Sequence, residues 1–344
     1  MRTVTVNASK SYDIKIGPGL LSSLGNEAIQ LGRAEKVAIV SETNVYPLYG
    51  KQTEASLRDA GFTVVSFVFP AGEEQKSAAT YLELLTFLAE SKLTRTDLIV
   101  ALGGGVVGDL AGFAAATYLR GIRFIQIPTT LLAAVDSSVG GKTAIDLPAG
   151  KNLVGAFWQP SLVLCDTDTL SSLPRDIFLD GCAEVIKYGI LYDEAFFSCL
   201  ESSGPDFDRE TVIARCVEMK RDVVTEDEFD TGARMKLNLG HTIGHGVEAS
   251  SEFTLSHGKS VAIGMAIVSR ASHCQDADRI LKILNQFELP VTTDTDADTL
   301  FRYTLSDKKR SGGTVNLILP ERIGCCAIVP TPVENILSFI EEGL

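Results

Sequence analysis

Short apolar runs rich in β-branched residues alternate with amphipathic stretches along the first half of the chain. The amphipathic stretches, 46–60 and 78–89, carry apolar residues at helical spacing. The β-rich runs cover residues 37–40, 62–69, 97–102, 124–128 and 162–166. Strands that alternate with helices in this way predict βαβ units around a parallel sheet, and thus an α/β fold.

The pattern changes after about residue 176, where β-branched runs become rare and long repeats at helical spacing begin. These repeats cover residues 176–201, 208–222, 231–250, 257–275 and 276–287. A late run at 315–320 predicts a strand that pairs with 326–330. We therefore expect an α/β domain at 1–175 and a mostly helical domain at 176–344, divided at the turn-rich SSLPRD segment, with a cleft between them.

Composition limits the cellular context of these two domains. The chain has 344 residues, 45% of them hydrophobic, which is enough for a full core in each domain. It has neither a long uncharged apolar run nor a signal-peptide pattern, so we expect a soluble cytoplasmic protein without membrane contact. The formal charge of −13 argues against nucleic acid or anionic lipid as a partner, since both are polyanions. The seven cysteines include no C-x-x-C pair and are expected to stay reduced.

A glycine-rich loop follows the predicted strand at 97–102. In DLIVALGGGVVGDLAGF, Gly103, Gly105 and Gly108 satisfy the G-x-G-x-x-G pattern of Rossmann-like nucleotide sites. Glycine lets the backbone approach a pyrophosphate, and a following helix N-terminus favours negative charge. The alternative is a tight turn in which the glycines serve only packing. A second loop, PAGEEQKS at 70–77, also follows a strand and favours the nucleotide interpretation.

The segment 127–160 is rich in groups that bind anions. Hydroxyl side chains lie near paired glycines, Lys142, Lys151 and the amide of Asn152. GGKT resembles the end of a P-loop, but Asp136 stands where that motif needs glycine, so a nucleoside triphosphatase is excluded. An ordinary polar surface loop is the alternative. Two lysines beside paired glycines in an acidic chain favour a phosphate or carboxylate ligand.

The third feature is a candidate metal site. His241, His245 and His257 are three of only four histidines, and Glu184 lies in a predicted helix with Lys187. His241 and His245 share a helix face, and imidazole with carboxylate suits zinc or a similar ion with one position open for substrate. A solvated or capping histidine pair is the alternative. The glycines that flank the pair weaken a helix by roughly 1 kcal/mol each, which indicates that a close approach requires them.

Taken together, these motifs resemble the 3-dehydroquinate synthase family of sugar-phosphate cyclases. The similar segments are PAGEEQKS, ALGGGVVGDLAGFAAATYLRG, IPTTLLAAVDSSVGGKTAID, GKNLVGAFWQP, AEVIKYGI, LNLGHTIGHGVE and SHGKSVAIGM. The resemblance implies a homodimer with an N-terminal NAD-binding domain and a helical metal- and substrate-binding domain. It also implies that Zn²⁺ or Co²⁺ is bound by Glu184, His241 and His257, which leaves His245 beside the substrate.

The activity that this resemblance implies is a lyase reaction of the shikimate pathway. 3-Deoxy-D-arabino-heptulosonate 7-phosphate, a phosphorylated sugar acid, is transiently oxidised by NAD, loses phosphate, is reduced again and closes a carbocycle by aldol addition. A cyclase of sedoheptulose 7-phosphate and a metal-dependent polyol dehydrogenase are the alternative enzymes. A binding module without turnover is the non-enzymatic alternative.

The resemblance also assigns site residues. The positions implied for NAD are Glu42, Asn44, Gly72, Glu73, Lys76, Gly105, Val106, Val107, Gly108, Asp109, Thr129, Thr130, Lys142, Lys151, Thr169, Leu170, Ser171 and Ser172. The positions implied for substrate and catalysis are Arg120, Asp136, Lys142, Asn152, Lys187, Lys220, Arg234, Asn238 and His245, together with Lys308 or Lys309. In a dimer, Arg120 would serve the site of the partner.

The chain departs from the common family pattern at four positions without losing an implied ligand. Ala71, Gln75 and Ala134 stand where family members often have an acid, a histidine and a glutamine. Lys259 replaces a common glutamate two residues after His257, and its positive charge is expected to alter the affinity for the metal.

Overall fold

The computed structural model describes every residue except 253 and 308–312. The chain divides into two compact units. The first comprises Met1–Pro174 with Arg209–Phe229, and the second comprises Arg175–Asp208 with Asp230–Leu344. The sequence predicted a single domain boundary near 175. In the structure, the chain crosses into the second unit there but contributes one later helix, within Arg209–Phe229, to the first unit.

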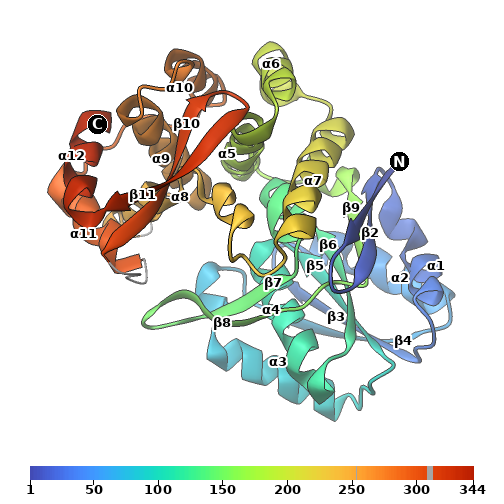
Figure 1. Ribbon diagram of the computed structural model, residues 1–344. Helices are drawn as coiled ribbons and strands as arrows, with labels where there is room; N and C mark the ends of the chain where they lie inside the picture. Colours follow the sequence, from blue (N-terminus) through green and yellow to red (C-terminus); the bar gives the residue numbers. More distant parts are fainter. Residues whose placement is uncertain (253, 308–312) are drawn as a thin grey trace. The chain divides into compact units, whose positions relative to one another are not determined.

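A seven-stranded sheet forms the centre of the first unit, in the order β1-β2-β9-β6-β5-β3-β4 (Figure 1). Only β1 is antiparallel to its neighbour. The strands are β1 (Arg2–Asn7), β2 (Ser11–Gly17), β3 (Lys36–Glu42), β4 (Thr63–Phe69), β5 (Leu98–Gly103), β6 (Arg123–Pro128) and β9 (Leu162–Asp166). The predicted parallel sheet is thus present, with an N-terminal hairpin added at one edge.

Helices cover both faces of this sheet. They are α1 (Leu24–Gln30), α2 (Lys51–Asp59), α3 (Ala78–Glu90), α4 (Gly105–Thr117) and α7 (Arg209–Glu226). Side chains of β3 alternate between two cores: Val37 and Ile39 join the core under α1 and α2, and Ala38 and Val40 join the core under α3 and α4. Burial on both faces explains why the strands are continuous apolar runs.

A separate antiparallel ribbon packs beside α4. It consists of β7 (Lys142–Leu147) and β8 (Gly150–Phe157), and it was not expected from the sequence. Thr143 of β7 contacts α4 where Gly112 leaves space for it. The ribbon brings part of the segment that was predicted to bind anions alongside the helix that follows the glycine loop.

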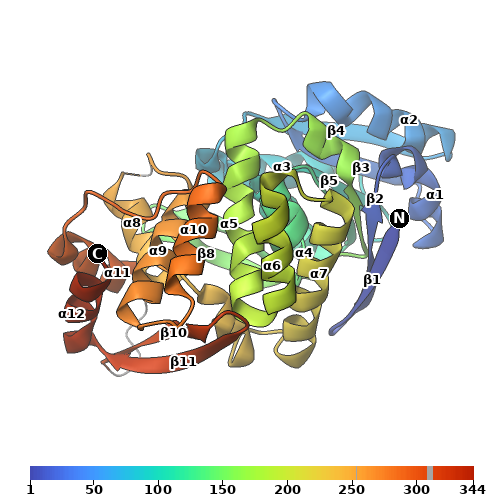
Figure 2. The same cartoon turned by 90° about the horizontal axis from the view of Figure 1, so that it is seen from above.

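The second unit is helical apart from one hairpin. Its helices are α5 (Arg175–Tyr192), α6 (Glu194–Ser203), α8 (His241–Ser250), α9 (His257–Ala271), α10 (Ala277–Gln286), α11 (Ala297–Asp307) and α12 (Val333–Gly343). The predicted hairpin forms from β10 (Thr314–Arg322) and β11 (Cys325–Pro332). The buried helix α9 packs against α5, α8, α10 and α12 (Figure 2).

Two of the predicted long helices are interrupted. The stretch 176–201 is broken between α5 and α6, where the Asp193 side chain accepts a hydrogen bond from the backbone N–H of Phe196 and caps α6. The stretch 231–250 is broken at Gly240, which adopts φ 75° before α8. In the described part of the chain, no helix is both long enough and apolar enough to cross a membrane.

Candidate metal centre and nucleotide site

Three helices of the second unit bring a carboxylate and two imidazoles together. Glu184 lies on α5, His241 is the first residue of α8, and His257 is the first residue of α9. The Nε2 atom of His241 lies 3.3 Å from Oε1 of Glu184, and the Nε2 atom of His257 lies 3.4 Å from the same oxygen. The predicted ligands are thus adjacent although they are far apart in the chain.

The spacing fits a tetrahedral metal ion. Two ligand atoms at the usual zinc distances of about 2.0–2.2 Å in a tetrahedral site are separated by about 3.4 Å. Glu184 is 1% exposed, and its carboxylate oxygens lie against the Lys187 ammonium and the two imidazole rings. Burying a carboxylate is costly unless a cation compensates it. The donor set and its spacing therefore suit a divalent cation.

Lys187 provides one compensating charge, because its ammonium contacts Oε2 of Glu184 from one turn along α5. Burial by itself raises the pKa of Glu184, but Lys187 and His241 outweigh this effect and hold the pKa well below its usual value. Glu184 is therefore ionised and available as a ligand at neutral pH.

The two histidines titrate in opposite directions. Burial lowers the pKa of His241 to about 4 despite the opposing charge of Glu184. Burial also disfavours the charged form of His257, but hydrogen bonds to Glu184 and Glu248 prevail and raise its pKa to about 10. Without a metal, His257 carries a proton at neutral pH and His241 does not.

Close contact between α8 and α9 depends on glycine. A Cβ atom at Gly264 would overlap the backbone oxygen of Gly240, and a Cβ at Gly244 would lie 2.8 Å from the backbone oxygen of Ser260. The glycines around the histidine pair were predicted to permit a close approach, and this prediction is confirmed. The close packing of α8 on α9 places His241 and His257 beside the same oxygen of Glu184.

The other described site candidates of the second unit lie on α8 and in the 3-10 helix before it. The ring centroid of His245 is 5.5 Å from that of His241 and 6.0 Å from that of His257. Arg234, which is 2% exposed, and Asn238 belong to a 3-10 helix, Ala233–Asn238. Lys308 and Lys309 lie outside the described residues.

Sequence reasoning missed Glu248, which faces the same cluster from α8. Its Oε2 lies 3.5 Å from Nδ1 of His257, and His245, Glu248 and His257 form a second group with closely spaced ligand atoms. The signal was present, since Glu248 follows His245 by three residues and His241 by seven, and such residues share a helix face.

In the first unit, the glycine loop joins β5 to α4 at the carboxyl edge of the sheet. From β3 the chain proceeds to β4 on one side, and from β5 it proceeds to β6 on the other. The strand order therefore reverses between β3 and β5, which is where open α/β sheets bind ligands. Glu42 ends β3, and its carboxylate accepts the backbone N–H of Asn44 at 2.6 Å and that of Val45 at 3.0 Å. The Glu42 turn and the glycine loop thus flank the reversal.

The glycines of the loop have different roles. A Cβ at Gly108 would overlap the side chain of Gln126, and one at Gly103 would lie 2.5 Å from Val107, so both are needed for packing. A Cβ at Gly105 would meet only Ser137 Oγ, at the ordinary contact distance of 3.4 Å. The packing alternative therefore explains Gly103 and Gly108 but not Gly105.

Buried hydroxyls lie near the start of α4. Among the described residues, the hydroxyls of Thr129, Ser137 and Ser138 are buried without hydrogen-bond partners. Thr129 is adjacent to the loop, since its backbone N–H donates to the carbonyl of Gly103 at 3.0 Å. Hydroxyl donors beside a helix N-terminus suit an anionic group such as a pyrophosphate.

Lys76 connects the second predicted loop to α4 and to the ribbon. Its ammonium lies 2.5 Å from Asp109 Oδ2 and also donates a hydrogen bond to the side chain of Asn152. Burial raises the pKa of Asp109, although Lys76 opposes this shift. Lys151 lies 4.0 Å from Glu73. The structure thus groups Asn152, predicted to contact substrate, with the residues predicted to contact NAD.

Helix α7 contributes Lys220 to the first unit. Its ammonium lies 2.8 Å from Oδ1 of Asp136 and donates to the Asp136 carbonyl at 2.7 Å. Asp136 and Lys220, predicted together as site residues, are therefore in direct contact.

Tyr49 contacts two residues that were predicted to bind NAD, in and directly after the 3-10 helix that follows β9. Its hydroxyl donates to the carbonyl of Thr169 at 3.0 Å and contacts the Ser172 hydroxyl at 2.5 Å.

Arg120 is not near the glycine loop. It follows the other end of α4, which has 13 residues and is therefore about 20 Å long, and it adopts φ 67° after Leu119 at φ 50°. Lys142 is exposed at the start of β7. Arg120 therefore lies too far from this loop to act there while α4 is intact.

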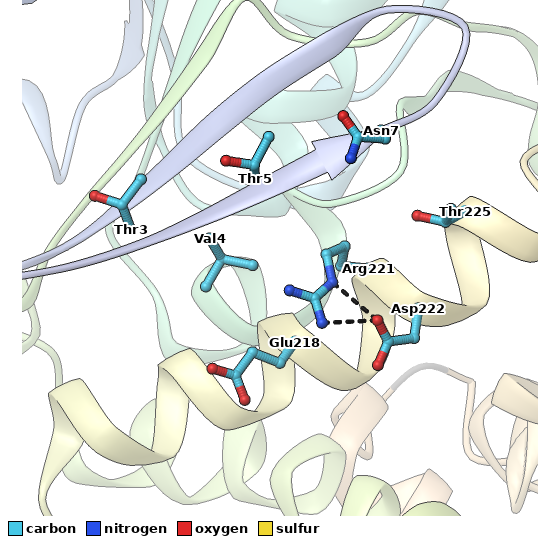
Figure 3. A pocket seen from close by; sticks show the side chains of 8 residues that line it. All are labelled: Thr3, Val4, Thr5, Asn7, Glu218, Arg221, Asp222 and Thr225. Atoms are coloured by element: carbon cyan, nitrogen blue, oxygen red, sulfur yellow. Dashed lines mark hydrogen bonds and ion pairs between the residues drawn. The ribbon is translucent and has the colours of Figure 1, made fainter.

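A surface cavity of about 530 Å³ lies between β1 and α7 (Figure 3). Its lining is Thr3, Val4, Thr5, Asn7, Glu218, Arg221, Asp222 and Thr225, and it includes none of the predicted site residues. The Arg221 guanidinium pairs with Asp222 at 2.7 Å. The candidate functional groups therefore lie elsewhere.

Comparison with known proteins covers both halves of the chain. A family model for the N-terminal part of 3-dehydroquinate synthase matches residues 66–180, and one for the C-terminal part matches residues 181–310. A 3-dehydroquinate synthase from Pelobacter propionicus is 47% identical over an alignment of 354 positions, which covers 98% of this chain and 99% of that protein.

Solved structures of two related enzymes share the architecture. A 2-deoxy-scyllo-inosose synthase, complexed with carbaglucose-6-phosphate, NAD⁺ and Co²⁺, has a TM-score of 0.90 at 27% identity, with 100% of both chains covered. A 2-epi-5-epi-valiolone synthase from Streptomyces hygroscopicus subsp. jinggangensis, with NAD⁺ and Zn²⁺ bound, has a TM-score of 0.87 at 26% identity, with 99% of both chains covered.

Proposed function

Because the chain belongs to the 3-dehydroquinate synthase family, we propose that it converts 3-deoxy-D-arabino-heptulosonate 7-phosphate into 3-dehydroquinate and phosphate. The reaction breaks a carbon–oxygen bond to phosphate and leaves no net change in redox state, so the enzyme is a lyase. The observation that carries the proposal is the tetrahedral ligand spacing of Glu184, His241 and His257 in the part of the chain that the C-terminal family model matches.

NAD and a divalent ion, Zn²⁺ or Co²⁺, are the proposed cofactors. When bound, NAD takes up a hydride from the substrate and returns it, and the ion polarises the oxygen at which charge develops. The first unit fits the nucleotide because the partly exposed start of α4 is accompanied by buried hydroxyls at Thr129 and Ser137. The second unit fits the ion through its three ligands.

Basic groups of the second unit are proposed to bind the anionic substrate. Arg234 is a buried guanidinium, and its planar fork of N–H donors matches the geometry of a carboxylate or phosphate. Lys187 contacts the proposed metal ligand Glu184, so an anionic group of the substrate that binds Lys187 would lie close to the ion. His245 lies on the same face of α8 as His241, and we propose that it holds or moves a proton on the substrate.

Assembly and location complete the proposal. We propose that the protein is a cytoplasmic homodimer. The position of Arg120, beyond the far end of α4 from the glycine loop, supports a role in the site of the other subunit.

The test is turnover by protein loaded with zinc and NAD. We expect phosphate and 3-dehydroquinate in equal amounts without accumulation of NADH. His245→Ala should retain zinc and lose most turnover, because the imidazole adjoins the ligands without belonging to them. The matched control is His273→Ala, whose ring is 79% exposed and pairs with Glu342.

Other outcomes separate the alternatives. Absence of phosphate release from folded, metal-loaded protein would contradict the proposal and lead to a trial of sedoheptulose 7-phosphate. Accumulation of NADH with a polyol would indicate a dehydrogenase instead. Binding of NAD and zinc without turnover of any of these compounds would indicate a binding module.

A further inference from the structure

The ring nitrogens of both histidine ligands are oriented in the same way. The Nε2 atoms of His241 and His257 face Oε1 of Glu184 at 3.3 and 3.4 Å. The Nδ1 atom of His241 lies 3.0 Å from the backbone oxygen of Leu239, and the Nδ1 atom of His257 lies 3.5 Å from Oε2 of Glu248. Each imidazole thus has one nitrogen toward the ligand cluster and one toward an oxygen acceptor.

A metal-binding histidine requires this arrangement. The coordinating nitrogen must keep its lone pair, so the other nitrogen carries the proton and needs an acceptor. The acceptor for His241 is a backbone carbonyl, which no side-chain substitution removes. The acceptor for His257 is the side chain of Glu248, which is 7% exposed and lies two helical turns after His241 on α8.

We propose that Glu248 is a positioning residue for metal binding: it accepts the Nδ1–H of His257 and keeps Nε2 directed at the ion. The inference rests on the metal site of the proposed function. Glu248 acts through His257 and is not itself a ligand, because its carboxylate lies against the nitrogen that faces away from Glu184.

The position of His257 explains why it needs such support. It is the first residue of α9, and its side chain is 34% exposed, compared with 13% for His241. The backbone there is already fixed, since Asp180 accepts the Ser256 hydroxyl at 2.5 Å and the Lys259 N–H at 3.0 Å. Rotation of the His257 ring remains to be restrained, and Glu248 supplies the restraint.

The experiment measures metal affinity rather than turnover. The wild type, Glu248→Gln and Glu248→Ala are stripped of metal, and the zinc dissociation constant of each is measured by competition with a chelator. We expect binding to weaken by about 10- to 100-fold for Glu248→Ala, as is typical for partners of metal-bound histidines. Glu248→Gln should lie between it and the wild type, because an amide oxygen still accepts a hydrogen bond without the charge.

The matched control is Glu252→Gln, which removes an exposed carboxylate just beyond the same helix. It should bind zinc within about twofold of the wild type. Circular dichroism verifies folding. If Glu248→Ala fails to fold, the nearly isosteric Glu248→Gln carries the test.

Cobalt provides the second readout. At saturating Co²⁺, the wild type and Glu248→Gln should show the same visible absorption bands, because the three ligands are unchanged. A change in these bands that indicates a lost ligand would overturn the proposal. Zinc affinity within about twofold of the wild type in both folded variants would also overturn it, and reduced turnover in that case would indicate a role at His245.

These outcomes differ from a failure of the proposed function, since zinc and cobalt binding are measured without substrate. If the wild type bound zinc as expected but released no phosphate, the proposed reaction would fail while the role of Glu248 would stand.

Discussion

At the residue scale, the proposed metal centre depends on competition between a proton and a cation for the same imidazole. Glu184 and Glu248 stabilise the protonated form of His257 in the metal-free protein and raise its pKa to about 10. A metal requires the neutral ring. When the ion is absent, both carboxylates therefore favour a proton on the His257 ring. When the ion is bound, Glu248 favours the ring orientation that directs Nε2 at the ion.

This competition predicts proton release on metal binding. Between pH 7 and 9, metal-free His257 is protonated and must lose a proton, so zinc affinity should fall about tenfold for each unit of decreasing pH. Titration calorimetry in buffers with different ionisation enthalpies should detect about one released proton. A His257→Ala variant should bind zinc weakly and should release no such proton on binding. Release of no proton by the wild type at pH 7.5 would contradict the pKa assignment.

At the element scale, glycine serves two separate purposes, and each was partly visible in the sequence. The sequence indicated that the glycines of the G-x-G-x-x-G pattern and those around His241 and His245 have a structural or binding role. Which role each glycine has depends on neighbours that come from other elements. Gly108 faces Gln126 of β6, whereas Gly105 has space around it. The pattern alone does not distinguish these roles because it contains no information about which side chain lies opposite.

Substitution by alanine should separate the two roles in the loop. Gly105→Ala should leave the melting temperature nearly unchanged and weaken NAD binding by tenfold or more, because a methyl group at the helix start hinders a close ligand. Gly108→Ala should lower the free energy of unfolding by about 1–3 kcal/mol through overpacking against Gln126. Fluorescence titration with NADH and thermal melts measure both effects. Unchanged NAD affinity in Gly105→Ala would favour the packing alternative.

The contact between α8 and α9 makes a further prediction. Gly264→Ala should separate these helices, destabilise the protein by about 1–3 kcal/mol and weaken zinc binding, because His241 and His257 lie on the two helices. Gly189→Ala on α5 is the matched control, since its Cβ would meet Phe197 at 3.2 Å. It should be destabilised less and should keep its zinc affinity. Chelator competition and thermal melts provide the comparison, and equal zinc loss in both variants would contradict the mechanism.

At the scale of the whole molecule, one helix changes the division of the chain. The repeat at 208–222 was assigned to the helical second domain, but α7 belongs to the first unit. It packs on β1, the Met1 amino group lies 3.0 Å from Glu210, and Arg2 donates to Thr211 at 3.1 Å. The N-terminal hairpin and α7 therefore support each other. Lys220 consequently contacts Asp136 in the first unit.

The position of Arg120 leads to a prediction for the proposed dimer. Arg120→Ala and His241→Ala should each be inactive. When the two variants are mixed and their subunits exchanged, about a quarter of the sites should become intact if Arg120 serves the other subunit. Turnover of the mixture measures this recovery, and ultracentrifugation establishes the dimer. Activity no greater than that of the separate variants, despite exchange, would contradict the shared site.

The family resemblance, the parallel sheet and the chemical type of the candidate metal ligands followed from sequence alone. Strands buried on both faces leave continuous apolar runs, the glycine loop has a fixed spacing after β5, and His241 and His245 lie one helical turn apart. Each of these signals is local, so the order of residues along the chain records it. The family was identified from such motifs, and the comparisons confirm it.

Only the tertiary structure decided which distant residues meet. It placed Glu248 opposite Nδ1 of His257, joined Lys76 to Asp109 and Asn152, and returned α7 to the first unit. It also added β1 and β2 to the sheet as an edge hairpin. These contacts arise because packing selects partners by shape and charge across the whole chain. A single sequence records the residues that can form such contacts but not which of them become neighbours.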